Sequence, residues 1–287
     1  MAVRSTRRLL QYLAGVGLVA LTTGAASCCA HGAEQRQIET VSAALACARA
    51  ALGGSKALSA VSSLTVALEV TPDPANKRGR PSTTEITLGL PDKFKATDRM
   101  RLPNRNDLVL VRGFSGDRQL VEPSDENLKR MDEPGEDSLR LTRGEFAHWA
   151  LMLLLRETRP TPLTWSRKLT SDAAHFRIAA TGPNGFNMAL LLDKATCQPV
   201  AVTYERTPSF GDAMSGRTPT NGRQVERRDL LDYRTFDGIR LPTRIRTATD
   251  GMPRAELKVT SVQVNSPLPE DLRDSPPHTP RGSNPRR

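Results

Sequence analysis

Few residues of this chain carry side chains that could do catalytic or metal chemistry. The 287 residues include 4 histidines, and two of these, His31 and His278, lie near the chain ends. His148 and His175 remain as candidates, but neither has a second ligand residue at the helical or hairpin spacing of a zinc site. His148 could sense pH, although a hydrogen-bonded histidine at a packed surface is the more common role. We therefore expect no metal site.

The sequence motifs of common enzyme classes are also missing. Gly53-Gly54-Ser55-Lys56 lacks the upstream glycine and the preceding strand of a phosphate-binding loop. Neither a Gly-x-Ser-x-Gly nor a His-Glu-x-x-His sequence occurs. Nothing singles out a pair of carboxylates, and Asp229 and Asp232 are interpreted as solvated strand residues. The sequence therefore predicts a protein that is not an enzyme, with no catalytic residue and no cofactor.

The net charge of +10 would suit a nucleic-acid-binding protein, but it is concentrated at the chain ends. Without six terminal arginines the charge falls to +4; these are Arg4, Arg7, Arg8, Arg281, Arg286 and Arg287. Aromatic residues make up only 4% of the chain, too few for a surface that stacks bases. We expect no nucleic acid among the partners.

Residues 1-33 have the features of an export signal, with an arginine-rich start and an apolar stretch from Leu13 to Ala26. That stretch is shorter than the roughly 20 residues that cross a bilayer. Ala25-Ala26-Ser27-Cys28 resembles a lipobox, in which Cys28 would become a lipid anchor, and conventional cleavage nearby is the alternative. Export by the general route or by the twin-arginine route stays open. We expect the periplasm, with membrane anchoring only through Cys28.

Cys47 and Cys197 are the main cysteines of the exported body. An exported chain can keep disulfides, so a bridge between these two residues is one hypothesis. Two free thiols are the other. On a helical wheel Cys47 lies opposite the apolar stripe of its segment, so its surroundings do not decide between the two.

The body of the chain, residues 34-275, begins with a helical pattern. Apolar residues recur at three- and four-residue steps from Glu34 to Leu52, and Gly53-Gly54 ends the helix, because glycine tolerates the left-handed cap conformation. From Leu64 onward apolar and polar residues alternate, which is typical of strands with one wet face. Where the apolar phase slips after Val259, we expect a β-bulge.

Three dipeptides predict tight turns between antiparallel strands, and they are Asn184-Gly185, Asp237-Gly238 and Asp250-Gly251. No helix-sized segment alternates with the strands, so parallel βαβ units are not expected. The sequence predicts one domain that is mainly β (α+β), with an antiparallel sheet of consecutive neighbours. Pro72 to Pro81 and Thr207 to Arg223 are expected to be surface loops, and residues 276-287 a disordered tail.

One segment breaks the strand pattern. Thr142 and Glu145 have the spacing of a capping box, with Leu141 and Phe146 as its hydrophobic staple. The residues that follow, up to Leu155, are apolar except for one histidine. A helix that is apolar all round must be buried on more than one side. The sequence therefore predicts a buried helix inserted in a sheet protein.

Four motifs of turns and strand ends follow one another, namely Leu52-Gly53-Gly54, Leu90-Pro91-Asp92-Lys93-Phe94, the segment from Asp232 to Pro242, and Val262-Gln263-Val264-Asn265. With the apolar helix among them, this order resembles the LolA-like family of outer-membrane lipoprotein carriers and their envelope relatives, from about Arg36 to Ser275. The resemblance implies a curved, incomplete antiparallel β-barrel with an N-terminal helix and a central lid helix. No functional arginine of the carriers matches a position here.

The resemblance also implies a carrier that binds lipid or lipoprotein acyl chains in an apolar half-barrel. Five residues of the apolar helix would line the cavity as its lid, namely Phe146, Trp149, Met152, Leu153 and Leu154. Each gains roughly 1.5–3 kcal/mol on burial, and about a dozen methylenes of an acyl chain gain a comparable sum. We therefore expect a helix that a ligand can displace, and a helix that is permanent core is the alternative.

A non-enzymatic envelope sensor of the same fold, which binds another envelope protein, is the alternative function. The largely acidic segment from Glu122 to Asp137 could form its binding surface, although a charged segment is more often a solvated loop. The sequence does not predict an oligomeric state.

The intact mass of the protein from soluble and membrane fractions of the envelope tests whether residues 1-33 are removed as an export signal and whether Cys28 is lipidated. We expect a chain shortened at or after Ser27, and acyl mass on Cys28 if the lipobox is used. A shortened chain without acyl mass would exclude the anchor, and an intact leader would contradict export.

Overall fold

The computed structural model describes residues 38–75, 79–101, 107–123, 136–159, 161–182, 187–206 and 223–273. The chain divides into residues 1–36 and 37–287, and only the second unit contains described residues. The predictions for the export signal, Cys28, the Asn184-Gly185 turn and the tail lie outside the described residues. Most of the acidic segment, from residue 124 to residue 135, lies outside them too.

The described part of the chain is mainly β, as predicted. Its α-helices are α1 (Val41–Ala51), α2 (Ser55–Ser59) and α4 (Glu136–Leu154). Its strands are β1 (Ser63–Pro72), β2 (Ser82–Gly89), β3 (Lys93–Met100), β4 (Leu108–Ser115), β5 (Arg118–Pro123), β6 (Thr164–Trp165), β7 (Thr170–Ser171), β8 (His175–Thr181), β9 (Asn187–Asp193), β10 (Pro199–Arg206), β11 (Gln224–Phe236), β12 (Ile239–Thr249) and β13 (Met252–Val264). A short 3-10 helix, η2 (Glu270–Leu272), follows the last strand.

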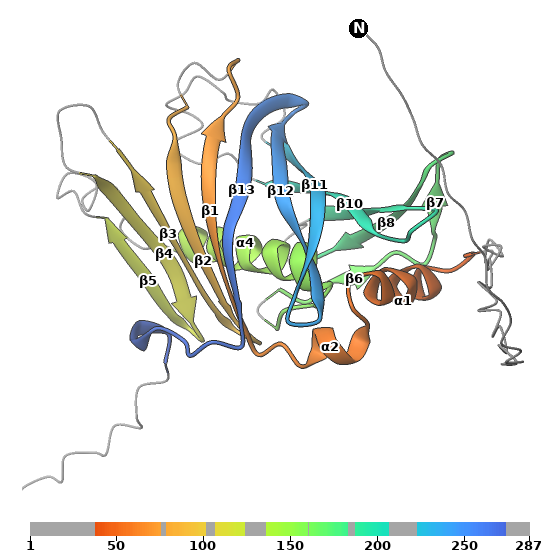
Figure 1. Ribbon diagram of the computed structural model, residues 1–287, viewed down its shortest axis with the longest axis horizontal. Coiled ribbons are helices and arrows are strands. Elements are labelled where there is room, and N and C mark those ends of the chain that lie inside the picture. Colours follow the sequence, from red (N-terminus) through yellow and green to blue (C-terminus); the bar gives the residue numbers. More distant parts are fainter. Residues whose placement is uncertain are drawn as a thin grey trace, which may run out of the picture. The chain divides into compact units, whose positions relative to one another are not determined.

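All the strands belong to one antiparallel sheet, in the order β5-β4-β3-β2-β1-β13-β12-β11-β10-β9-β8-β6, with β7 beside β8 (Figure 1). Almost every strand pairs with its neighbour in the chain, and the long-range exception is the pairing of β1 with β13. The edges β5 and β6 do not pair with each other, so the sheet is curved but open. The predicted incomplete barrel is confirmed.

The predicted bulge and two of the predicted turns are confirmed. Ala67 pairs with Ser261 and Leu68 with Val259, so Thr260 is the extra residue of a bulge in β13. The bulge keeps the apolar side chains before and after it on one face of the sheet. The turns β11–β12 and β12–β13 are formed by Asp237-Gly238 and Asp250-Gly251, and all four residues have positive φ, as tight hairpin turns require.

The first helix is shorter than predicted, because Thr40 caps it by accepting a hydrogen bond from the Ala43 amide at 3.2 Å. At its other end Gly53 has a φ of 113°, and a Cβ there would lie 2.2 Å from the Gly238 carbonyl oxygen. The Arg240 amide also donates to the Leu52 carbonyl at 2.9 Å. Glycine at position 53 therefore lets the helix end contact the β11–β12 turn directly.

A disulfide between Cys47 and Cys197 joins α1 to the turn between β9 and β10. The two cysteines are 150 residues apart in the sequence. A cross-link that closes such a long loop removes much of the conformational freedom of the unfolded chain.

We expect Cys47→Ser to lower the free energy of unfolding by up to about 5 kcal/mol, because the unfolded chain regains the entropy of the long loop. Urea unfolding of the oxidised protein and the variant measures the difference. Thiol titration of the unfolded, unreduced protein, with peptide mapping, is the control. Reactive thiols at both positions would contradict the bridge.

Candidate functional site: the face of the sheet that carries helix α4

Helix α4 connects the two edges of the sheet. β5 precedes it and β6 follows it, and these strands lie at opposite ends of the strand order. A helix of 19 residues spans about 28 Å, long enough to cross several strands. Its contacts with β4, β10 and β12 place it across one face, here called the concave face (Figure 1).

The five predicted lid residues are all buried in this interface. Each is at most 2% exposed, and together they are Phe146, Trp149, Met152, Leu153 and Leu154. Phe146 packs against Phe94 and Phe114 of the sheet, with ring centroids 5.9 and 5.4 Å apart. In this structure the lid residues therefore contact protein and form part of the core.

The apolar part of α4 is enclosed on all sides. Every side chain from Ala147 to Leu155 is at most 2% exposed. The chain after the helix folds back over it, where the Thr161 hydroxyl reaches the Arg143 carbonyl at 3.4 Å. Arg156 donates to the Val61 carbonyl at 2.7 Å and so ties the end of α4 to the start of β1.

The predicted capping box is wrong. The helix begins at Glu136, so Thr142 and Glu145 lie inside it, and the Thr142 hydroxyl donates to the Ser138 carbonyl at 2.9 Å. Leu141 is 39% exposed while Phe146 is fully buried, so these two residues do not form a staple. The helix extends further back than the pattern indicated, and Glu145 is free for another role.

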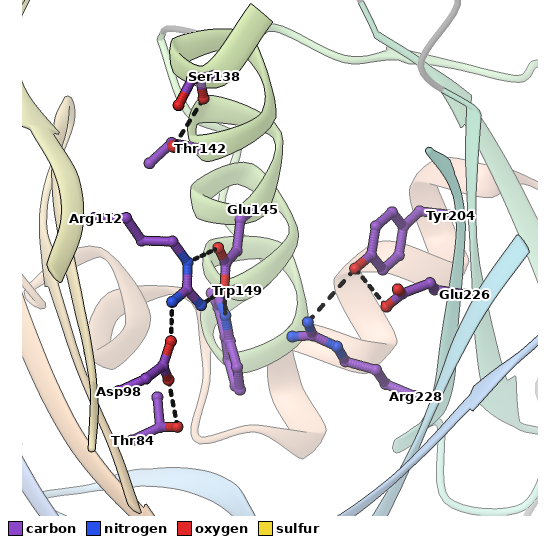
Figure 2. A network of polar contacts seen from close by, with 10 residues as sticks. All are labelled: Thr84, Asp98, Arg112, Ser138, Thr142, Glu145, Trp149, Tyr204, Glu226 and Arg228. Atoms are coloured by element: carbon purple, nitrogen blue, oxygen red, sulfur yellow. Dashed lines mark hydrogen bonds and ion pairs between the residues drawn. The ribbon is translucent and has the colours of Figure 1, made fainter. Parts of the chain in front are cut away.

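That role is an ion pair with the sheet. Arg112 of β4 donates from Nε and Nη2 to both carboxylate oxygens of Glu145, at 2.8 and 2.9 Å (Figure 2). Its Nη1 donates to Asp98 of β3, which also accepts a 2.7 Å hydrogen bond from the Thr84 hydroxyl. Trp149 Nε1 donates to Glu145 at 3.4 Å. Three strands and the helix thus share one polar cluster.

The ion pair keeps Glu145 charged. Burial alone would raise the pKa of its carboxyl, but the positive charge and hydrogen bonds of Arg112 outweigh burial and lower that pKa to about 2. For Arg112, burial opposes the charged form, and the attraction of Glu145 and Asp98 outweighs it and raises the pKa. Both groups are therefore ionised throughout the physiological range.

A second polar group lies on the other side of Trp149. The Arg228 guanidinium stacks over the Trp149 ring, 4.5 Å from its centroid, and its Nη2 donates to the Tyr204 hydroxyl at 3.5 Å. That hydroxyl donates to Glu226 at 2.8 Å (Figure 2). Trp149 therefore lies between charged groups from β3 and β4 and a polar cluster from β10 and β11.

His148 is not the hydrogen-bonded histidine that the sequence suggested. It is fully buried, and neither ring nitrogen has a hydrogen-bond partner among the residues that the structure describes. Its ring lies 3.9 Å from that of Tyr204. Burial lowers the pKa of His148 well below its usual range, and the charge of Arg228 lowers it further, so the imidazole is neutral.

On the concave face of β1 to β4 and β13, side chains of neighbouring strands form rows across the sheet. The exposure of these side chains increases from row to row along the direction of β1. One row beneath α4 is almost fully buried and contains Leu64, Leu88, Phe94 and Phe114. Three rows further along β1, the pairing joins Leu257, Val70, Ser82, Met100 and Leu108. Leu257 is buried and the other four are half-buried. This row, here called the apolar row, extends the concave face beyond the contacts of Phe146 and Glu145.

Sequence reasoning missed Arg112 and Arg228, although a signal was present. Arg112 stands two residues before Phe114, and Arg228 two residues before Leu230, so each shares a face with an apolar residue of its strand. A charged residue at an inward-facing position of an alternating strand must find a partner. That requirement could have selected both arginines.

No group of His, Cys, Asp or Glu within the described residues has the arrangement of a metal site. Of the helices that the structure describes, none combines the length and apolar character needed to cross a bilayer.

No protein-family model matches the chain, and no curated protein sequence matches it. The solved structures that are similar to it include the following three. A LolA superfamily protein from Nitrosomonas europaea is 12% identical, with a TM-score of 0.45 over 79% of this chain and 97% of that one. A domain from Vibrio parahaemolyticus, named for outer membrane lipoprotein sorting, is 13% identical, with a TM-score of 0.40 over 73% and 88%.

The third is a DUF1329 family protein from Desulfovibrio piger, 10% identical, with a TM-score of 0.39 over 80% of this chain and 95% of that one. At TM-scores below 0.5, these likenesses do not indicate which ligand this chain binds.

The depressed pKa of Glu145 predicts a loss of stability in acid. The pair with Arg112 stabilises the fold fully above pH 4.5, the ordinary value for a glutamate, and the stabilisation is lost as pH falls toward about 2. The difference in pKa corresponds to at most about 3 kcal/mol, and less because the Glu145 side chain is 20% exposed.

Urea unfolding at pH 7 and pH 3 measures this loss. We expect Glu145→Gln to be less stable than the native protein at pH 7 and to lose less stability on acidification. Glu256→Gln, which removes the exposed pair with Arg246, is the control. Equal acid sensitivity of the native protein and Glu145→Gln would show that the pair does not couple α4 to the fold.

Proposed function

We propose that this protein is a non-enzymatic carrier of the bacterial envelope that binds the acyl chains of a lipid or lipoprotein against the concave face. In this proposal α4 is the displaceable helix, and its five lid residues occupy the surface that the ligand takes. The observation that supports it is the apolar concave face, which α4 covers only in part.

The energies of helix and ligand favour exchange. Each lid residue gains roughly 1.5–3 kcal/mol from burial, and an acyl chain gains roughly 0.8 kcal/mol per methylene, so one chain can replace most of what the helix contributes. The apolar row would bind the first methylenes of the acyl chain while α4 is still in place, because most of its side chains are only half-buried.

The ion pair of Arg112 with Glu145 would keep the helix closed when no ligand is present. If α4 moves away, Glu145 becomes hydrated and Arg112 keeps Asp98 as a partner, so neither charge stays buried alone. An ion pair whose members both keep a partner or reach water is cheaper to open than one that strands a charge.

Export to the periplasm is part of the proposal, supported by the leader sequence and by the disulfide of Cys47 with Cys197. The role of Cys28 as a lipid anchor is proposed on the leader sequence alone.

If α4 and ligand compete, weakening the attachment of α4 must strengthen binding. We expect Arg112→Ala to bind monolauroylglycerol, a neutral single-chain lipid, about tenfold more tightly than the native protein, as a loss of 1.4 kcal/mol from the closed state would produce. Isothermal titration calorimetry measures both affinities. Arg246→Ala, which removes the exposed pair with Glu256, is the matched control and should leave binding unchanged.

Two results would contradict the carrier. One is the absence of lipid in mass spectra of protein purified without detergent, together with no binding of monolauroylglycerol. The other is an Arg112→Ala variant with a lower melting temperature and unchanged or weaker binding, which would indicate that α4 is permanent core.

A further inference from the structure

The concave face contains buried hydrogen-bond donors that no described residue satisfies, and they belong to Arg228. This residue is 8% exposed, and its Nε and Nη1 atoms are buried without a hydrogen-bond partner in the described part of the chain. Its remaining nitrogen, Nη2, makes one long bond of 3.5 Å to the Tyr204 hydroxyl. A guanidinium is always charged and carries five N–H donors, so burying it without acceptors is unfavourable.

The aromatic contacts of Arg228 do not fill these donors. The Arg228 Cζ atom lies over the Trp149 ring, 4.5 Å from its centroid, and the ring interacts with the positive charge of the guanidinium. The face of an aromatic ring offers no oxygen or nitrogen lone pair, so this contact does not replace a conventional hydrogen bond. The edge formed by Nε and Nη2 is the side that binds planar oxyanions in a bidentate manner. An oxyanion there would satisfy Nε and replace the long bond from Nη2 to Tyr204.

His148 adds a second unsatisfied group beside the first. Both of its ring nitrogens are buried without a partner from the described segments, and its ring and Arg228 share Tyr204 as a neighbour. A neutral imidazole offers one N–H donor, and both nitrogens donate once it is protonated. An anion near Arg228 would offset the positive charge that now opposes protonation of His148.

The carboxylates facing Arg228 are engaged elsewhere. Glu226 accepts a hydrogen bond from Tyr204, and Glu145 accepts both of its close ionic hydrogen bonds from Arg112. Arg112 therefore has two acidic partners, Asp98 and Glu145, while Nε and Nη1 of Arg228 have none among the described residues. The contrast between the two arginines is the reason to assign Arg228 to a ligand.

The place of Arg228 in the sheet connects it to the apolar row. Pairing continues that row from Leu257 to Ile245 and then to Leu230. Arg228 lies two residues from Leu230 on the same face of β11. A ligand with an apolar chain along the row would therefore have its head group next to the unsatisfied donors.

We propose that Arg228 and His148 form a binding site for an oxyanion, a phosphate or carboxylate group. The assignment of this oxyanion to the head group of a bound lipid rests on the proposed carrier function. The site then selects lipids with an acidic head group over lipids with a neutral one.

Calorimetry on the full-length protein with three probes tests the site: dodecyl phosphate, monolauroylglycerol and inorganic phosphate, all below their aggregation concentrations. The native protein should bind dodecyl phosphate about tenfold more tightly than monolauroylglycerol, the range expected for hydrogen bonds to a charged group. Arg228→Gln should abolish this preference, so that the variant binds the two lipids with affinities within about twofold of each other. Arg228→Lys, which keeps the charge and loses the fork of donors, should retain part of the preference.

Arg227→Gln is the matched control, because Arg227 is the next residue of the same strand, exposed on the opposite face and paired with Asp229. It should keep the full preference. If Arg228→Gln fails to fold, the melting temperature of the native protein decides. Phosphate should raise it relative to chloride at equal ionic strength, and no difference would overturn the site.

The probes separate the two proposals. Binding of inorganic phosphate that depends on Arg228, without binding of either lipid, would support the oxyanion site with a free anion as its ligand and would contradict the carrier. Binding of both lipids without preference, or a preference that survives in Arg228→Gln, would overturn the oxyanion site and leave the carrier intact. No binding of any probe would overturn both.

Discussion

The ion pair of Arg112 with Glu145 joins the helix to the sheet, and the arrangement of the concave face depends on it. The pairing of β1 with β13 leaves β5 and β6 as open edges, so the chain between them has to cross the sheet. Apolar packing of α4 is not directional, and it would tolerate many positions of the helix. The bidentate bond to Glu145, with Asp98 behind the guanidinium, allows only one. It thereby also fixes Trp149 between the two polar clusters.

This arrangement gives α4 two unequal halves. Its apolar half contributes packing energy that another apolar group can replace, whereas Glu145 contributes a specific bond that a neutral chain cannot. A helix held only by packing would open to any apolar molecule, and one held by many ion pairs would not open at all. One partly buried ion pair, with a second pair of Arg143 to the exposed Asp117, beside a replaceable apolar surface is the compromise that reversible binding needs. The donors of Arg228 add a preference for the charge of the ligand.

The sequence predicted an antiparallel sheet of neighbouring strands, but neither the pairing of β1 with β13 nor the polar clusters. Period-two alternation predicted the strands, Asp237-Gly238 and Asp250-Gly251 predicted their turns, and the slip after Val259 predicted the bulge, because each depends on neighbouring residues. The Arg112–Glu145 pair joins residues 33 apart across a helix and a strand, and no local pattern contains it. Glu145 was interpreted as a capping residue for the same reason: the local spacing fitted, and the tertiary partner was not visible. The unsatisfied state of His148 and Arg228 depends on everything packed around them.

Hydrogen–deuterium exchange of α4 with and without bound monolauroylglycerol tests the central claim, the displacement of the helix by ligand, most directly. If ligand replaces α4, amides from Phe146 to Leu154 exchange faster when ligand is bound, while those of β11 and β12 stay protected. If those amides stay as protected as before, or become more protected, while calorimetry shows the ligand to be bound, α4 does not move and the ligand occupies another surface.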